Sequence, residues 1–171
     1  FAEKGMPCIS VEDITRSSGL AKGTFYLYFE NRNALEKELL DRCIELDLRH
    51  SMVGVDALPT YSEKLKRRVF NILHFSKSHP EESSILRQVY LPVNLAGTEN
   101  LPHSKSYEIN RHFIQMGIAA GEFRALPLDL LCQLFFSGVE GLSAYTRNHP
   151  EALEDAGVTD EALECLIRLL R

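Results

Sequence analysis

Apolar residues recur along most of this chain at intervals of three and four, which is the period of an amphipathic α-helix. Two runs keep this spacing over several turns: Leu35, Leu39, Cys43 and Leu46, and then Tyr61, Leu65, Val69 and Ile72. The sequence lacks the strict apolar–polar alternation of β-strands, and it contains no Asn-Gly or Asp-Gly hairpin pair. The pattern therefore predicts an all-α fold.

Residues typical of helix ends fall between the periodic stretches. Capping side chains or a proline predict helix starts at Ser10, Asn31, Thr60, Pro80 and Thr159. Glycines predict helix stops at Gly5, Gly19 and Gly121. Residues 54–59 should form a short linker, and residues 91–105, with two prolines and no apolar period, should form a loop.

Residues 10–29 predict two short helices joined by a tight turn. Val11 and Ile14 should point inward from the first helix, which ends near Ser18. Gly19 allows the positive φ of the turn, and Leu20 is expected to anchor that turn in the core.

The second of these helices opens at Lys22 and should bury Phe25 and Phe29, which are four residues apart. Its other side chains are expected to be exposed: Lys22, Thr24, Tyr26, Leu27 and Tyr28. Two short helices joined by a glycine turn, the second presenting hydroxyls and a cation, form a helix-turn-helix.

The exposed chemistry of this helix suits DNA. Lys22 lies near a helix N-terminus, where both its charge and the free amides favour phosphate, and Gly23 lets the backbone approach closely. The hydroxyls of the helix can donate to phosphates, and Thr24 or Leu27 can contact a thymine methyl in the major groove. Arg32, at the start of the next helix, adds a second cation.

The segment Gly-Leu-Ala-Lys-Gly-Thr-Phe-Tyr-Leu-Tyr-Phe at 19–29, followed by Asn-Arg-Asn-Ala-Leu at 31–35, resembles the recognition-helix signature of the tetracycline-repressor (TetR) family of transcriptional regulators. Residues 116–124 and 138–142 resemble the end of that family's core domain. The resemblance implies a three-helix DNA-binding domain in residues 1–49, with its first helix truncated. A helical effector-binding and dimerisation domain would follow in residues 50–171.

The resemblance also implies which residues meet double-stranded operator DNA. Positions that commonly contact the operator in this family are occupied by Ser10, Lys22, Gly23, Thr24, Tyr26 and Tyr28. Arg32 takes a position where a phosphate-binding lysine is usual, and Leu27 faces the groove by its spacing.

Aromatic and histidine side chains of the central helices are expected to be core residues that also line an effector cavity, as implied for a regulator of this type. The candidates for a small, largely apolar ligand are Phe70, His74, Tyr90, Tyr107, His112 and Phe113.

The segment 127–145 is apolar on more than one helical face, so either a deep core or another subunit must cover it. Residues 159–171 carry a second apolar stripe. We expect these two helices to pair with their symmetry mates in a homodimer. The interface is predicted at Leu131, Leu134, Phe135, Gly138, Leu142, Leu163, Leu166, Ile167 and Leu170.

Composition narrows the class without changing this picture. The 171 residues, 44% apolar and 25% charged, suit an ordinary globular protein, and no apolar run has the roughly 20 residues of a membrane span. The net charge of −5 argues against coating of nucleic acid by the whole surface but allows a local site. Four widely spaced cysteines suggest reduced thiols in a cytoplasm. The opening residues resemble neither a signal peptide nor a start methionine, so we expect the chain to begin inside a helix.

The sequence offers little for catalysis. Its six histidines lack metal-ligand spacing, and no nucleophile elbow or phosphate-binding glycine loop occurs, so we predict no enzyme activity, metal or cofactor. Two function classes remain. One is a ligand-responsive DNA-binding regulator, such as a repressor released from its operator by a small molecule. The other is an all-helical small-molecule carrier or enzyme that keeps a helix-turn-helix as a structural corner.

Overall fold

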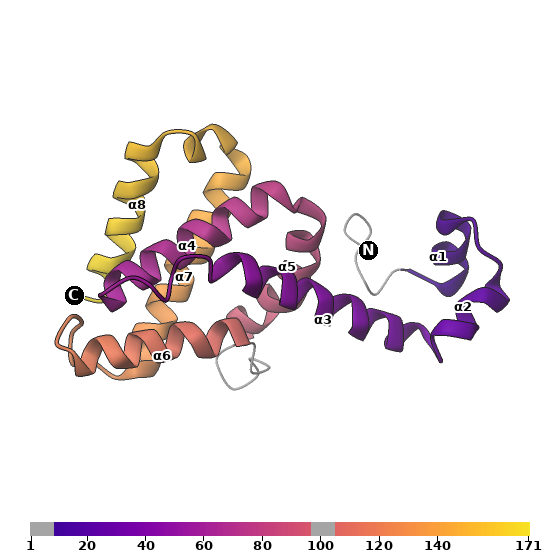
Figure 1. Ribbon diagram of the computed structural model, residues 1–171, viewed down its shortest axis with the longest axis horizontal. Helices are drawn as coiled ribbons and strands as arrows, with labels where there is room; N and C mark the ends of the chain where they lie inside the picture. Colours follow the sequence, from indigo (N-terminus) through magenta and orange to yellow (C-terminus); the bar gives the residue numbers. More distant parts are fainter. Residues whose placement is uncertain (1–8, 97–104) are drawn as a thin grey trace.

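The computed structural model describes residues 9–96 and 105–171, and within that part it is built of helices without a strand (Figure 1). The elements are α1 (Val11–Ser18), α2 (Lys22–Tyr28), α3 (Arg32–Ser51), α4 (Tyr61–Ser78), α5 (Pro80–Ala96), α6 (Lys105–Ala119), α7 (Leu128–Asn148), the 3₁₀ turn η3 (Pro150–Leu153) and α8 (Ala156–Arg168). The all-α prediction is confirmed. The predicted helix stop at Gly5 and the opening residues lie outside the described part.

Local capping explains most of the helix boundaries. Ser10 and Thr60 each form a capping box with the acidic residue three positions later, and the Asn31 side chain accepts from the amide of Ala34. Gly19 closes α1 with φ 70°, as predicted. These caps depend only on residues within one turn of the chain, so the sequence alone specifies them.

Two predicted boundaries are wrong. Thr159 lies inside α8: Asp155 caps this helix by accepting from two amides, and the Thr159 hydroxyl donates to the Ala152 carbonyl. The loop predicted at 91–105 begins too early, because α5 continues through Pro92 to Ala96. Proline removes one backbone donor, and a loss this close to the helix end does not stop α5. Residues 97–104 lie outside the described part.

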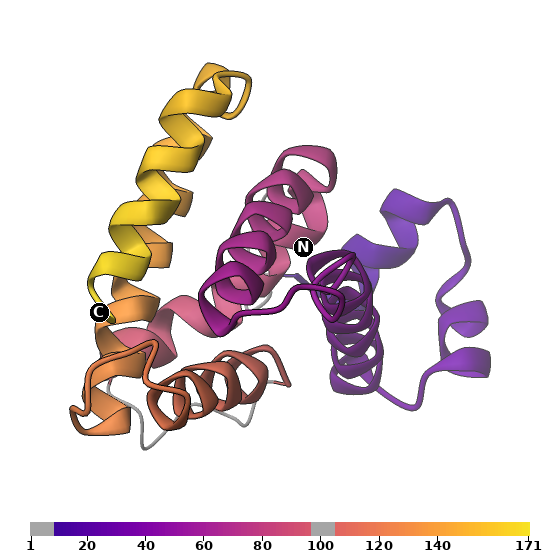
Figure 2. The same cartoon turned by 60° about the vertical axis from the view of Figure 1, so that its left-hand side comes forward.

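Helix α4 lies at the centre of the larger helical body and contacts α3, α5, α6, α7 and α8 (Figures 1 and 2). The main core joins α4 to α6, α7 and α8, and its fully buried side chains include Leu65, Ile114, Leu131, Phe135 and Ile167. Figure 2 shows α7 and α8 running side by side at one edge of this body.

Helix α3 connects this body to α1 and α2, which lie at its far end (Figure 1). Its inner half packs on α4 and α5 through Cys43, with Leu39 and Leu46 on the same face. The apolar period read in the sequence is therefore the packed face of α3. The linker at 54–59 is also confirmed, and its Val55 is fully buried.

Candidate nucleic-acid interface and central cavity

The side chains of α1 and of the turn between α1 and α2 pack differently from what the sequence predicted. Thr15 is the buried residue of α1, while Val11 and Ile14 are only half-buried. Leu20 was expected to anchor the turn in the core, but it is 53% exposed. The turn is instead held by backbone bonds from the amides of Gly19 and Leu20 to the end of α1, which need no buried side chain.

Helix α2 presents a fixed inner face and an open outer face. Phe25 is buried, and its ring lies 5.5 Å from that of Phe29. Leu27 and Tyr28 are 81% and 78% exposed, more than the other large hydrophobic residues among those described. Tyr26 is exposed as well, whereas Thr24 is half-buried, so its expected exposure is only partial.

The two predicted cations are already engaged by the protein. Lys22 Nζ donates to Glu12 Oε1 at 2.5 Å, which raises the pKa of Lys22 and lowers that of Glu12. Arg32 donates from Nη1 to the carbonyl of Ile9 at 2.9 Å and pairs with Glu36 at 2.7 Å. Arg32 thus ties the segment before α1 to α3, while Lys22 is held on the surface between α1 and α2.

The other predicted DNA contacts are an exposed hydroxyl on Ser10 and an open backbone position at Gly23. The Ser10 hydroxyl is exposed at the start of α1, where it accepts from the Asp13 amide and donates to the Asp13 carboxylate. Gly23 lies in the first turn of α2, and a Cβ placed there would meet nothing within 4 Å. The backbone of α2 is therefore open at Gly23.

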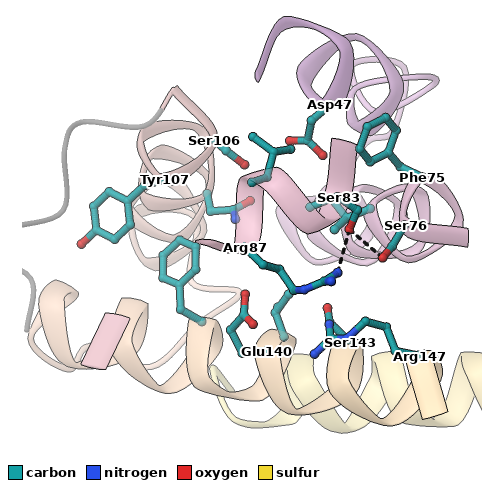
Figure 3. Close-up of a pocket in the computed structure, with 15 residues that line it drawn as sticks. Asp47, Phe75, Ser76, Ser83, Arg87, Ser106, Tyr107, Glu140, Ser143 and Arg147 are labelled. Carbon is teal, nitrogen blue, oxygen red and sulfur yellow. Dashed lines mark hydrogen bonds between the residues drawn. The ribbon is translucent and has the colours of Figure 1, made fainter. Parts of the chain in front are cut away.

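A cavity of about 120 Å³ lies among α3, α4, α5, α6 and α7 (Figure 3). Its apolar walls include Ile72, Phe75, Leu86, Phe136 and Val139, and its polar groups include Asp47, Arg87, Glu140 and Arg147. Sequence reasoning missed these residues, apart from an expectation that aromatics of the central helices line a pocket.

Of the six predicted pocket residues, Tyr107 lines this cavity. Phe113 is instead buried in the main core, and His112 is exposed. The rings of Phe70 and His74 lie 4.2 Å apart, tilted to each other by 42°, and outside this lining. Phe70 lies in a groove between α4 and α8. Helix α4 turns a different face toward the cavity than expected. The side chain of Tyr90 lies outside the described part.

Two charged groups of the cavity are strongly affected by their surroundings. Burial raises the pKa of Asp47 to about 6, and the charge of Arg68 partly opposes this rise. Arg68 itself is fully buried and donates to Asn110 Oδ1 at 2.5 Å and Ser106 Oγ at 2.6 Å. Burial also lowers the pKa of Arg87, and the charge of Arg147 lowers it further. The cavity therefore combines apolar walls with charged groups, of which Asp47 is buried and Arg87 is half-buried.

Most predicted interface residues fill the core of this chain. The buried ones are Leu131, Phe135, Leu163, Leu166, Ile167 and Leu170. Leu142 is half-buried, and a Cβ at Gly138 would clash with the Leu166 side chain of the same chain. Only Leu134, 40% exposed, presents a large apolar surface. The several apolar faces of α7 are explained first by a deep core, which was one of the two explanations left open.

Exposed apolar residues nevertheless continue along both helices. On α7, Leu130, Leu134 and Tyr145 are exposed with Gly141 between them. Val158 of α8 and Leu169, the residue that caps the end of α8, are exposed as well. The α7 positions are separated by four, seven and four residues, and the other two by eleven, so each set lies on one helical face.

Comparisons with known proteins agree on one family. Residues 1–39 match the family described as "Bacterial regulatory proteins, tetR family". A curated relative, the "Uncharacterized HTH-type transcriptional regulator YvdT" of Bacillus subtilis, is 53% identical over 35 residues, which cover 20% of this chain and 18% of the relative.

Similarity to solved structures extends over the whole fold. A putative tetR family transcription regulator from Shewanella sp. PV-4 aligns with a TM-score of 0.74 at 18% identity, covering 99% of this chain and 91% of that one. A TetR family transcription regulator from Marinobacter aquaeolei VT8 gives 0.77 at 16% identity, covering 99% and 88%. The fatty acid degradation regulator FadR from Bacillus halodurans gives 0.69 at 20% identity, covering 97% and 88%. Among the described residues, no helix is long and apolar enough to cross a membrane.

Proposed function

This chain belongs to the TetR family of bacterial regulatory proteins, and from that premise we propose that it is a sequence-specific regulator of transcription that binds double-stranded operator DNA. The observation that carries the proposal is the outer face of α2. Leu27 and Tyr28 leave large apolar surfaces in water on a helix whose inner face is fixed by Phe25. A helix fixed in this way can enter a major groove without rearranging.

We assign the contacts by exposure and chemistry. Leu27 faces the base edges, where a thymine methyl offers an apolar partner, and Thr24 supports it from the half-buried side. The phosphate contacts are Ser10, Lys22, Gly23, Tyr26, Tyr28 and Arg32. Those contacts set the position of the protein on the duplex, and the base contacts set the sequence preference.

We propose that two copies pair through the exposed faces of α7 and α8. Leu134 and Tyr145 of α7, with Leu169 at the end of α8, would meet their symmetry mates in a four-helix contact, and Gly141 lets the helices approach closely. A dimer presents two recognition helices to successive major grooves on one side of the DNA, about 34–36 Å apart.

We further propose that residues 1–49 bind DNA and that residues 50–171 bind an effector and the second subunit. The cavity touches α3 directly, because Asp47 of α3 is one of its lining residues. A ligand that binds more tightly when α3 is in a position unsuited to DNA weakens operator binding. By linkage, the operator weakens ligand binding by the same factor. In this role the protein is a repressor released by its ligand.

The test is binding of a fluorescent duplex from the protein's own upstream region, against a scrambled duplex, at several salt concentrations. A regulator prefers the first duplex, and log affinity falls linearly with log salt by several ion equivalents. Equal binding to both duplexes, or none, rejects the proposal and leaves the carrier or enzyme with a structural helix-turn-helix.

A further inference from the structure

The central cavity has a polar side that ordinary core packing does not require. Figure 3 shows the guanidinium of Arg87 pointing toward Ser76 and Ser83, with Ser143 and Arg147 beside it. Two guanidinium groups from α5 and α7 thus share one side of the cavity with three hydroxyls. Asp47 reaches the cavity from α3, on the side away from α7.

The charge of Arg87 is poorly compensated within the protein. Its Nη1 donates to Ser83 Oγ at 3.3 Å, and Ser83 Oγ lies 2.8 Å from Ser76 Oγ. Among the described residues, no carboxylate forms an ion pair with Arg87 or with Arg147. The charge of Glu140 favours the charged form of Arg87, but burial and the charge of Arg147 outweigh it and lower the Arg87 pKa. An anion between the two arginines would offset both the burial of the Arg87 charge and its repulsion by Arg147.

The remaining walls of the cavity indicate the chemistry and size of the rest of the ligand. Phe75, Leu86, Phe136 and Val139 supply an apolar surface next to the arginines. The cavity volume of about 120 Å³ is close to the roughly 150 Å³ of a cavity that holds one benzene ring. The cavity therefore has room for one ring or a short alkyl chain.

We propose that this cavity binds a small carboxylic acid with one aryl ring or a short alkyl tail, its carboxylate held between Arg87 and Arg147. The planar guanidinium fork of arginine matches a carboxylate, and the three serine hydroxyls can donate to the same oxygens. Asp47 and Glu140 also line the cavity, and Asp47 repels the carboxylate from the α3 side, so the tail lies toward α3. The inference rests on the regulator proposed above and names the chemistry of its effector.

The test compares benzoate with benzamide, a neutral molecule of nearly the same shape, by calorimetric titration of the purified protein without DNA. Benzoate should bind at least tenfold more tightly than benzamide, which corresponds to about 1.4 kcal/mol. Arg87→Met and Arg147→Met should each weaken benzoate at least tenfold and leave benzamide unchanged. Arg124→Met, which removes an exposed arginine outside the cavity, should change neither.

Circular dichroism and thermal melting of each variant identify any loss of folding, and Arg147, which is exposed, supplies a variant with little structural cost. Equal affinity for acid and amide, or unchanged benzoate binding in both arginine variants, overturns the proposal. Absence of benzoate binding overturns it too. Operator binding is measured separately, without any ligand. A failure of benzoate binding therefore leaves the proposed DNA-binding function intact, whereas an absence of specific DNA binding rejects that function itself.

Discussion

Lys22 of α2 and Glu12 of α1 form an ion pair of 2.5 Å on the surface that we assign to DNA. The hydrogen bond from Lys22 is the largest cause that lowers the Glu12 pKa, so the carboxylate stays ionised well below neutral pH. Both side chains are more than half exposed. A phosphate that approaches Lys22 must therefore compete with a carboxylate that the protein supplies.

Replacing Glu12 with Gln should strengthen DNA binding. The change frees Lys22 and removes a negative charge facing the phosphates, which should raise affinity for every duplex about two- to fivefold, and more at low salt. Fluorescence anisotropy at two salt concentrations measures it. Glu45→Gln removes a similarly exposed carboxylate, paired with Arg49 on α3, and should have no effect. Weaker binding by Glu12→Gln would show that the pair positions Lys22 for DNA.

The division of labour along α2 gives a second prediction. Lys22→Ala should weaken binding to all sequences by a similar factor and lower the salt slope by about one ion. Leu27→Ala should instead change the ranking of operator variants, because Leu27 is 81% exposed and carries no charge. Thr24→Ala should change that ranking less, since Thr24 is half-buried. Binding of a panel of single-base operator variants separates these outcomes. Parallel losses in all three proteins would refute the assignment.

How far the sequence predicts this structure depends on the distance over which each feature is decided. The capping boxes at Ser10 and Thr60 involve residues three positions apart, and the period of Leu39 and Cys43 lies within one helix. Such features were predicted correctly. The helix start predicted at Thr159 was wrong because Asp155, just upstream, is a better cap whose side chain accepts from two amides.

The cavity could not be predicted in the same way. Its residues come from five helices, and which of them meet depends on how each helix is rotated in the packed body. Phe70 and Phe75 are both aromatic residues of α4, yet only Phe75 lines the cavity. The exposed face of α2 was predictable because α2 is short and Phe25, its buried residue, fixes its rotation.

Neighbouring residues of α7 supply a third prediction, on dimerisation. Leu134 is 40% exposed, while Phe135 is fully buried in the core of the same chain. Leu134→Glu should leave the fold intact and dissociate the dimer at micromolar concentration, because it places charges at the symmetric contact. Phe135→Glu should unfold the protein instead, since it buries an unpaired charge.

Sedimentation velocity and circular dichroism together distinguish these two effects. Gln133→Glu, at a half-buried polar position next to Leu134 on α7, serves as the control and should preserve both fold and dimer. A Leu134→Glu protein that stays dimeric would exclude this face as the interface.

Asp47 supplies the last prediction, on pH dependence. Burial raises the pKa of its carboxyl from 3.8 to about 6 in the folded protein, so the folded state binds this proton more tightly than the unfolded state does. The stability that this proton contributes is complete below pH 4 and is lost as the pH rises through 6. The shift of about two pKa units corresponds to about 3 kcal/mol at most.

Asp47→Asn keeps the shape of the side chain without its charge. Relative to wild type, its free energy of unfolding should rise by about 2 kcal/mol between pH 4.5 and pH 8, with most of the change between pH 5 and pH 7. Urea unfolding across this range measures the difference. Asp160→Asn, at an exposed position of α8, should track wild type throughout. A constant difference between Asp47→Asn and wild type would show that Asp47 keeps the same pKa in the folded and unfolded states.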